Sequence, residues 1–167
     1  MAPVTLKDIQ KLHNFLSDRG VDYVLTGTCA LFYDGALPEG EHAHDIDILV
    51  IATQETMPPL RTMFKELEEF SGCEKEPKYD GSECYTFKVG TCDIKVNAFI
   101  ENVQVDGMKS NYPPFNLVTI DGAGTTIKVM PAIPALRRKF KLHREKDYRF
   151  GAKLIKEISG MMLNVYE

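Results

Sequence analysis

The sequence DIDILVI at residues 45–51 is the stretch that decides the architecture of this chain. Its β-branched and apolar residues are typical of a strand, in which side chains alternate between two faces. Asp45 and Asp47 therefore point to one side, with Cα atoms roughly 7 Å apart, while Ile46 and Ile48 point into the opposite layer. The apolar residues that follow indicate a buried strand, where idle charge is costly.

We interpret Asp45 and Asp47 as ligands of a divalent cation. Two like charges on one face of a strand repel each other unless a cation lies between them. Carboxylate oxygens suit Mg²⁺ or Mn²⁺, and Mg²⁺ completes its shell with waters and the phosphate oxygens of a substrate. The alternative is the start of a strand whose solvent-facing side is acidic without having a function.

Two further motifs carry polar groups in suggestive places. In CDIKVNAFI, residues 92–100, Asp93 shares one face with Lys95 and Asn97, which makes Asp93 a candidate third ligand or an ordinary solvent-facing acid. In LTGT, residues 25–28, a strand turns into a helix through Gly27 and Thr28. Glycine lets the backbone approach a phosphate and a helix start offers N–H donors, although an ordinary turn with Thr28 as N-cap explains the same residues.

The remaining pattern predicts an α/β or α+β fold with a mixed sheet flanked by helices and closed by C-terminal helices. No linker divides the chain, so we expect a single domain over residues 1–167. The predicted elements are a helix capped by Thr5 and ended by Gly20, strands over 21–26 and 45–51, a short helix from Thr28, a loop over 34–44, a helix over 58–70, a polar turn over 75–83, a hairpin of strands 84–89 and 92–99, a loop over 102–116, a hairpin of strands 117–120 and 126–130, and helices from Pro131 and over 146–162.

Composition and charge limit the kinds of binding partner and the cellular compartment that we expect for this protein. The formal net charge of −4 and the isoelectric point near 5.6 disfavour general nucleic-acid binding, although a single nucleotide remains compatible with them. No apolar run reaches the roughly 18 residues of a membrane span, and the N-terminus lacks an export signal. The cysteines show no close pairing, so we expect free thiols in a reducing cytoplasm, with a Cys84–Cys92 disulfide as the alternative.

The order of these motifs resembles the DNA polymerase β-like nucleotidyltransferase superfamily. That family has a glycine followed by Ser, Gly or Thr after a strand, then an acid–apolar–acid strand, then a third acid on a later strand. LTGTCALFYDG and HDIDILV are similar to the small bacterial group that includes lincosamide nucleotidyltransferases and the nucleotidyltransferase toxins of abortive-infection systems. IDGAGTTIKVMP and LRRKFKLHREKDY resemble the family's closing strand and helices, so the likeness covers most of residues 21–158.

The resemblance implies a nucleotidyltransferase that moves a nucleoside monophosphate from a nucleoside triphosphate to an unidentified hydroxyl acceptor and releases pyrophosphate. It implies that Asp45, Asp47 and Asp93 hold Mg²⁺ or Mn²⁺, and that Asp93 can also accept the proton of the attacking hydroxyl. Gly27 and Thr28 would face the triphosphate. Further candidate phosphate contacts are Lys139, Arg144 and Lys146, although a basic helix end is commonly just a solvated surface.

The chain departs from the family pattern in two places. The loop between Gly27 and Asp45 is longer than usual, and it offers Glu41, His42 and His44 where small relatives carry an arginine. The two histidines are a metal pair or, without further ligands, a surface pair. The last helix also lacks a second acid near Phe150. Two other functions therefore stay open, a non-catalytic nucleotide-binding or interaction module and a metal-dependent phosphohydrolase. The acceptor, the preferred nucleotide and the oligomeric state have no signature in the sequence.

Overall fold

The computed structural model describes residues 2–33, 37–38, 40–73, 83–101, 104–105, 108–109, 111–120, 124–141, 148–149 and 151–156. Its elements, in chain order, are α1 (Leu6–Ser17), β1 (Tyr23–Thr26), α2 (Gly27–Tyr33), β2 (Asp45–Ala52), α3 (Met57–Ser71), β3 (Glu83–Val89), β4 (Cys92–Ile100), β5 (Gln104–Val105), β6 (Met108–Lys109), β7 (Asn116–Thr119), β8 (Thr126–Val129) and α4 (Ala132–Lys141).

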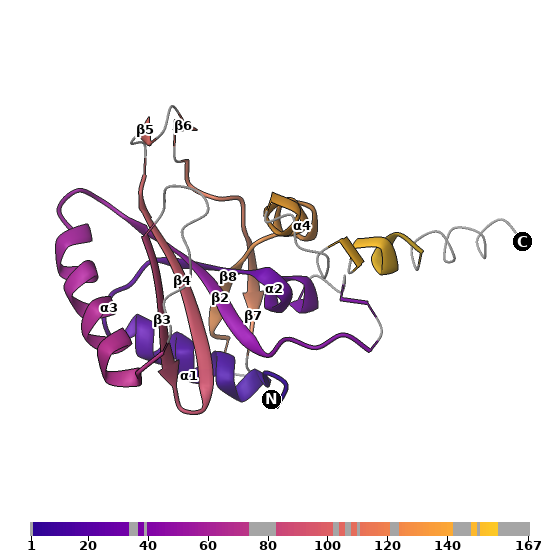
Figure 1. Ribbon diagram of the computed structural model, residues 1–167, viewed down its shortest axis with the longest axis horizontal. Helices are drawn as coiled ribbons and strands as arrows, with labels where there is room; N and C mark the ends of the chain where they lie inside the picture. The colour runs from indigo at the N-terminus through magenta and orange to yellow at the C-terminus, as the bar shows by residue number, and fades with distance from the viewer. Residues whose placement is uncertain are drawn as a thin grey trace, which may run out of the picture.

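Six of the strands form one mixed sheet in the order β3-β4-β2-β1-β8-β7. The pairs β2–β4 and β1–β8 are parallel, whereas β1–β2, β3–β4 and β7–β8 are antiparallel. Figure 1 shows α3 beside β3 at one edge of this sheet, and α2 and α4 next to each other on the opposite side of the molecule. The predicted α+β class with a mixed sheet flanked by helices is confirmed.

One face of the sheet is apolar and carries the core. Alternate residues of β2 and β4 are buried on it, among them Ile46, Ile48 and Ile94. The Phe64 ring of α3 stacks on Phe87 of the adjoining strand β3 with ring centroids 5.9 Å apart, which closes this face on one side. Burial of each such side chain contributes about 1.5–3 kcal/mol. Because the period of a strand is two, the same alternation turns the acids of β2 to the other face.

Helix α1 begins where the sequence predicts. Thr5 and Asp8 form the capping box: the Asp8 carboxylate accepts the Thr5 N–H at 2.8 Å, and the Thr5 hydroxyl accepts the Asp8 N–H at 3.3 Å. Its apolar stripe, Ile9, Leu12 and Leu16, is buried in the core. The amphipathic helix predicted from Thr5 is therefore confirmed.

Helix α3 also covers the outer edge of the sheet. The Glu68 carboxylate accepts the main-chain N–H of Thr86 at 2.9 Å, and the Ser71 hydroxyl accepts that of Lys88 at 3.0 Å. Both donors belong to β3, whose outer side has no neighbouring strand in this sheet. Glu68 is 93% buried, so this edge is closed by a charged side chain that is itself held inside the protein.

Several expectations need correction. Helix α2 begins at Gly27, one residue before the predicted start, because Gly27 already turns the chain with φ +66°. The predicted loop over 102–116 contains the two-residue strands β5 and β6, and its last residue begins β7; strands this short leave no apolar periodicity. The alternative disulfide is absent, since all four cysteines are free and Cys84 pairs in register with Asn97.

The C-terminal helix is described in part. Residues 148–149 and 151–156 are helical, and the rest of the predicted span over 146–162 lies outside the described residues, as do most of the polar turn over 75–83 and part of the loop over 34–44. Of the helices that the structure describes, none is long and apolar enough to cross a membrane.

Candidate active site

The three acids singled out in the sequence lie on two neighbouring central strands. In the parallel pairing of β2 and β4, Asp45 is directly opposite Asp93, and Asp47 is opposite Lys95. Cross-strand partners share a face, so all three carboxylates emerge from the polar side of the sheet. The structure thus brings together residues 45, 47 and 93.

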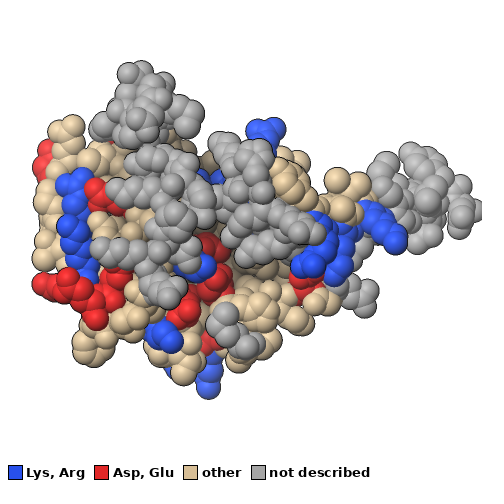
Figure 2. All heavy atoms as spheres, viewed as in Figure 1, with Lys and Arg blue, Asp and Glu red and all other residues tan. Residues whose placement is uncertain are grey.

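Two lysines provide counter-charge at this face. Lys95 Nζ lies 3.3 Å from Asp45 Oδ2, and Lys88 Nζ lies 3.6 Å from the Oδ1 atom of Asp93. Figure 2 shows acidic and basic atoms together in the middle of the molecular face where Figure 1 draws β2 and β4. Because both pairs are about one-third exposed or more, each contributes at most about 1 kcal/mol to folding.

One acid oxygen has an unfilled hydrogen-bonding capacity. Asp93 Oδ1 is buried, and among the described residues no group donates a hydrogen bond to it. Buried polar atoms nearly always have such a partner, so an unpartnered one calls for a ligand, a water or a proton. Asp93 also lines a cavity of about 230 Å³, whose described walls are formed by Ala2, Pro3, Val4, Asp8, His44, Lys88, Thr91, Cys92 and Asp93.

Gly27 packs directly against Asp47. Thr26 is the register partner of Asp47, so the chain turns from β1 into α2 immediately beside this carboxylate. A Cβ added at Gly27 would clash with Asp47 Oδ2 and would lie 3.0 Å from both Cβ and Cγ of Asp47. This contact and the φ of +66° both require glycine at position 27.

Burial and the charges of the acids raise the pKa values of two nearby cysteine thiols. The Cys29 thiol of α2 donates a hydrogen bond to the main-chain oxygen of Asp45 at 3.5 Å. Burial raises the pKa of Cys29, and the carboxylates of Asp47 and Asp45 raise it further. Burial likewise raises the pKa of Cys92 to about 11, with contributions from Asp8, Asp45 and Asp93. Both thiols are therefore protonated at neutral pH.

The basic helix α4 reaches the same region. It packs on α2, and the charge of half-buried Lys139 acts on Cys29 by slightly lowering its pKa. Arg138, which the sequence reasoning did not single out, donates from Nη2 to the Asn97 amide oxygen at 3.0 Å when that amide is oriented to satisfy both its ends. Arg144 and Lys146 lie outside the described residues.

The three acids offer the oxygen ligands that Mg²⁺ prefers, but their carboxylates do not lie close enough together to share one ion. Oxygen ligands on one face and the unpartnered Asp93 oxygen fit a hard cation. Among the residues that the structure describes, however, no group of three or more His, Cys, Asp or Glu side chains lies close enough together to hold a metal. The Lys95 ammonium would have to leave Asp45 for the carboxylates to share an ion. His42 and His44 line different cavities, so they do not face one site.

The fold is shared with solved structures of two proteins, one provisionally assigned as a nucleotidyltransferase and one an antibiotic-resistance factor. A crystal structure of a Thermotoga maritima protein provisionally assigned as a nucleotidyltransferase aligns with a TM-score of 0.53 and 18% identity, over 91% of this chain and 92% of its own. The sequence matches no protein-family profile, and no curated protein matches it significantly.

The antibiotic-resistance factor ANT(2″)-Ia has the same fold. Its structure in complex with adenylyl-2″-tobramycin aligns with a TM-score of 0.51 and 12% identity, over 96% of this chain and 92% of its own. Its solution structure aligns with the same TM-score and coverage at 14% identity. At these identities the likeness establishes the fold, and the chemistry has to be argued from the residues.

Proposed function

We propose that this protein is a divalent-metal-dependent nucleotidyltransferase that moves a nucleoside monophosphate from a nucleoside triphosphate to a hydroxyl acceptor and releases pyrophosphate. One observation carries the proposal: Asp45 lies opposite Asp93 on parallel central strands, with Asp47 on the same face, in a chain with the nucleotidyltransferase fold. We also propose that residues 1–167 form one domain and that the protein works in the cytoplasm.

Asp45, Asp47 and Asp93 would hold Mg²⁺ or Mn²⁺ in this proposal. A bound ion neutralises charge on the phosphate oxygens and orients the triphosphate. Lys95 gives up its ion pair with Asp45, and its ammonium is then available to a phosphate oxygen of the nucleotide. Gly27, Thr28 and Lys139, together with Arg144 and Lys146 in the undescribed part of the chain, are the other proposed contacts of the triphosphate.

The reaction is an in-line displacement at the α-phosphorus. The acceptor oxygen forms a bond to phosphorus while the bond to the pyrophosphate oxygen breaks, and the electron pair leaves with pyrophosphate. The acceptor proton goes to Asp93 Oδ1, which the described residues leave without a hydrogen bond. The cavity beside Asp93 gives space for part of a substrate.

The first experiment measures pyrophosphate release with Mg²⁺ and each nucleoside triphosphate. Acceptors would include tobramycin, whose adenylyl derivative is bound in the ANT(2″)-Ia complex, and water as the slow default. Combining Asp45→Asn with Asp47→Asn should abolish both release and metal-dependent nucleotide binding. Asp18→Asn, an exposed acid at the end of α1, is the matched control. Unchanged nucleotide binding by the double variant in calorimetry would contradict the proposal.

A second experiment isolates Asp93. Asp93→Asn removes a metal ligand and a proton acceptor together, so turnover at saturating nucleotide should fall at least about 10²-fold. Nucleotide affinity should fall less, because the loss is concentrated in the transition state. Turnover equal to that of the parent would remove Asp93 from the mechanism.

The alternative is a nucleotide-binding module without turnover. It is favoured by the same ion pairs: Lys95 and Lys88 already neutralise two of the three acids, and the described carboxylates do not converge on one point. This module would bind a nucleoside triphosphate in calorimetry and release no pyrophosphate with any acceptor. Release of inorganic phosphate instead would indicate a phosphohydrolase.

A further inference from the structure

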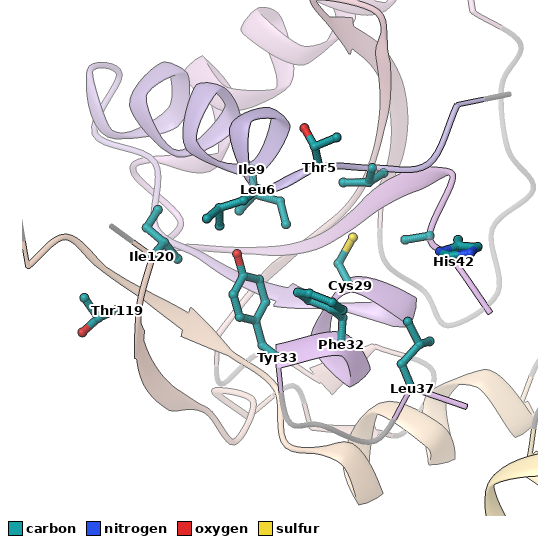
Figure 3. A pocket seen from close by; sticks show the side chains of 12 residues that line it. Thr5, Leu6, Ile9, Cys29, Phe32, Tyr33, Leu37, His42, Thr119 and Ile120 are labelled. Carbon is teal, nitrogen blue, oxygen red and sulfur yellow. The ribbon is translucent and has the colours of Figure 1, made fainter. Parts of the chain in front are cut away.

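A second cavity, of about 260 Å³, lies between α1, α2, the segment before β2 and the end of β7 (Figure 3). None of the three acids is among its described lining residues. It is lined by Val4, Thr5, Leu6, Ile9, Cys29, Phe32, Tyr33, Leu37, His42, Ala43, Thr119 and Ile120. Nothing in the proposed transfer reaction uses this space.

The described lining is largely apolar and contains no Asp, Glu, Lys or Arg. Leu6 and Ile9 of α1 face Phe32 of α2 across the cavity, as Figure 3 shows. The Phe32 side chain is 59% exposed, an unusual degree for an aromatic ring that borders a cavity. A charged ligand would lose its hydration in such surroundings without gaining an ionic partner, so the site favours a neutral one.

Tyr33 contributes a hydroxyl group without a described hydrogen-bond partner to this largely apolar lining. The Tyr33 hydroxyl points from α2 toward Leu6 and Ile9 of α1 in Figure 3. Its oxygen is buried, and the described part of the chain offers it no hydrogen-bond partner. Burial raises the pKa of Tyr33 to about 12, so the group is a hydrogen-bond donor at neutral pH. Buried tyrosine hydroxyls normally have a partner, and here the cavity is where one would lie.

We propose that this cavity binds a small uncharged molecule with an aromatic or alicyclic body and one oxygen that accepts a hydrogen bond from Tyr33. Its volume lies just below the range of about 300–1,000 Å³ for drug-sized ligands, so the molecule is of fragment size. The ligand would cover the exposed Phe32 ring and occupy the hydrogen-bonding capacity of Tyr33. This site is distinct from the nucleotide site and does not rest on the proposed transfer activity.

The cavity wall is joined to the acid strand. Cys29 lines the cavity, and its thiol donates to the main-chain oxygen of Asp45. Ala43 also lines it and accepts a hydrogen bond from the Val4 N–H at 2.7 Å, which fixes the N-terminal segment against the approach to β2. A ligand in this cavity would therefore contact Cys29 and Ala43, whose hydrogen bonds connect the cavity wall to the start of β2 and to the segment before it.

The test uses three probes that differ in one property each. Acetophenone has a ring and an accepting oxygen, ethylbenzene lacks the oxygen, and benzoate adds a charge. Titration followed by methyl NMR should show saturable shifts for Ile9 and Ile120 with acetophenone. Ethylbenzene should bind about fivefold more weakly, the ratio expected for one net hydrogen bond of about 1 kcal/mol. Benzoate should bind more weakly than either neutral probe.

Three variants make the result decisive. Tyr33→Phe keeps the ring and removes only the unpartnered hydroxyl, so it should fold with undiminished thermal stability and bind acetophenone and ethylbenzene equally. Tyr148→Phe, an exposed tyrosine outside the cavity lining, should keep the preference. Ala43→Phe fills the cavity and should abolish binding. The proposal is wrong if Tyr33→Phe retains the preference for acetophenone, or if no probe gives saturable shifts up to its solubility limit.

Discussion

Gly27→Ala should lower both the unfolding free energy and the affinity for Mn²⁺ more than the matched variant Gly20→Ala does. The added methyl group would clash with the Asp47 carboxylate and lie 3.0 Å from the Asp47 Cβ atom. The carboxylate can rotate away, but the Cβ atom is fixed by the backbone of β2. Relief therefore requires movement of the β1–α2 turn or of the strand that carries the acids.

The magnitude follows from a comparison with Gly20. Gly20 has the same φ of +66°, and a Cβ added there meets nothing within 4 Å. Gly20→Ala therefore reports only the left-handed strain of about 1–2 kcal/mol, less the 0.4–1 kcal/mol that alanine gains by restricting the unfolded chain. Gly27→Ala adds overpacking, which typically costs about 1–3 kcal/mol. The difference between the two variants isolates the contact with Asp47.

Urea denaturation of both variants measures this difference, and Mn²⁺ titration by calorimetry measures the effect on the acids. We expect Gly27→Ala to lose about 1–3 kcal/mol more unfolding free energy than Gly20→Ala, and to bind Mn²⁺ more weakly. Equal stability losses together with parent-like Mn²⁺ affinity would refute the reasoning. A larger stability loss with unchanged Mn²⁺ affinity would keep the packing contact and remove Asp47 from the metal site.

Two further variants test the ion pairs and the sheet edge. Lys95→Met removes the ammonium that neutralises the β2 carboxylate, so Mn²⁺ should bind several-fold more tightly in calorimetry, while unfolding free energy falls by no more than about 1 kcal/mol. Lys65→Met on the exposed side of α3 is the control, and weaker Mn²⁺ binding by Lys95→Met would show that the lysine assists the metal. Glu68→Ala leaves the Thr86 N–H without its acceptor and should cost about 1–3 kcal/mol in urea denaturation, whereas exposed Glu69→Ala should change little. A Glu68→Ala loss below about 0.5 kcal/mol would mean that water replaces the carboxylate.

Local patterns in the sequence predicted which side chains share a face. The alternation in DIDILVI and CDIKVNAFI assigns the acids of each strand to one side because the period of two is a property of the extended backbone itself. The hairpin around Gly90 was predicted for the same reason, since its two strands are neighbours in the chain. The capping box at Thr5 is another local signal that the structure contains.

Long-range register was not predictable in this way. The pairing of Asp45 with Asp93, and with it the ion pair between Lys95 and Asp45, depends on how β4 aligns with β2 across the intervening α3 and β3. Only the family resemblance placed the third acid near the first two. Gly27 was predicted to make room for phosphate, whereas the structure shows Asp47 against it, a contact that no spacing in the sequence encodes.

The parallel pairing of β2 with β4 has a consequence for the order of folding. Residues 45 and 93 meet only after the chain between them has closed a long loop, whose entropic cost precedes any gain from the contact. The parallel pairing of β1 with β8, in which residue 25 lies opposite residue 129, closes a long loop as well. A chain that ends before β4 therefore contains Asp45 and Asp47 but lacks both Asp93 and the Lys95 ammonium that pairs with Asp45 in the folded protein.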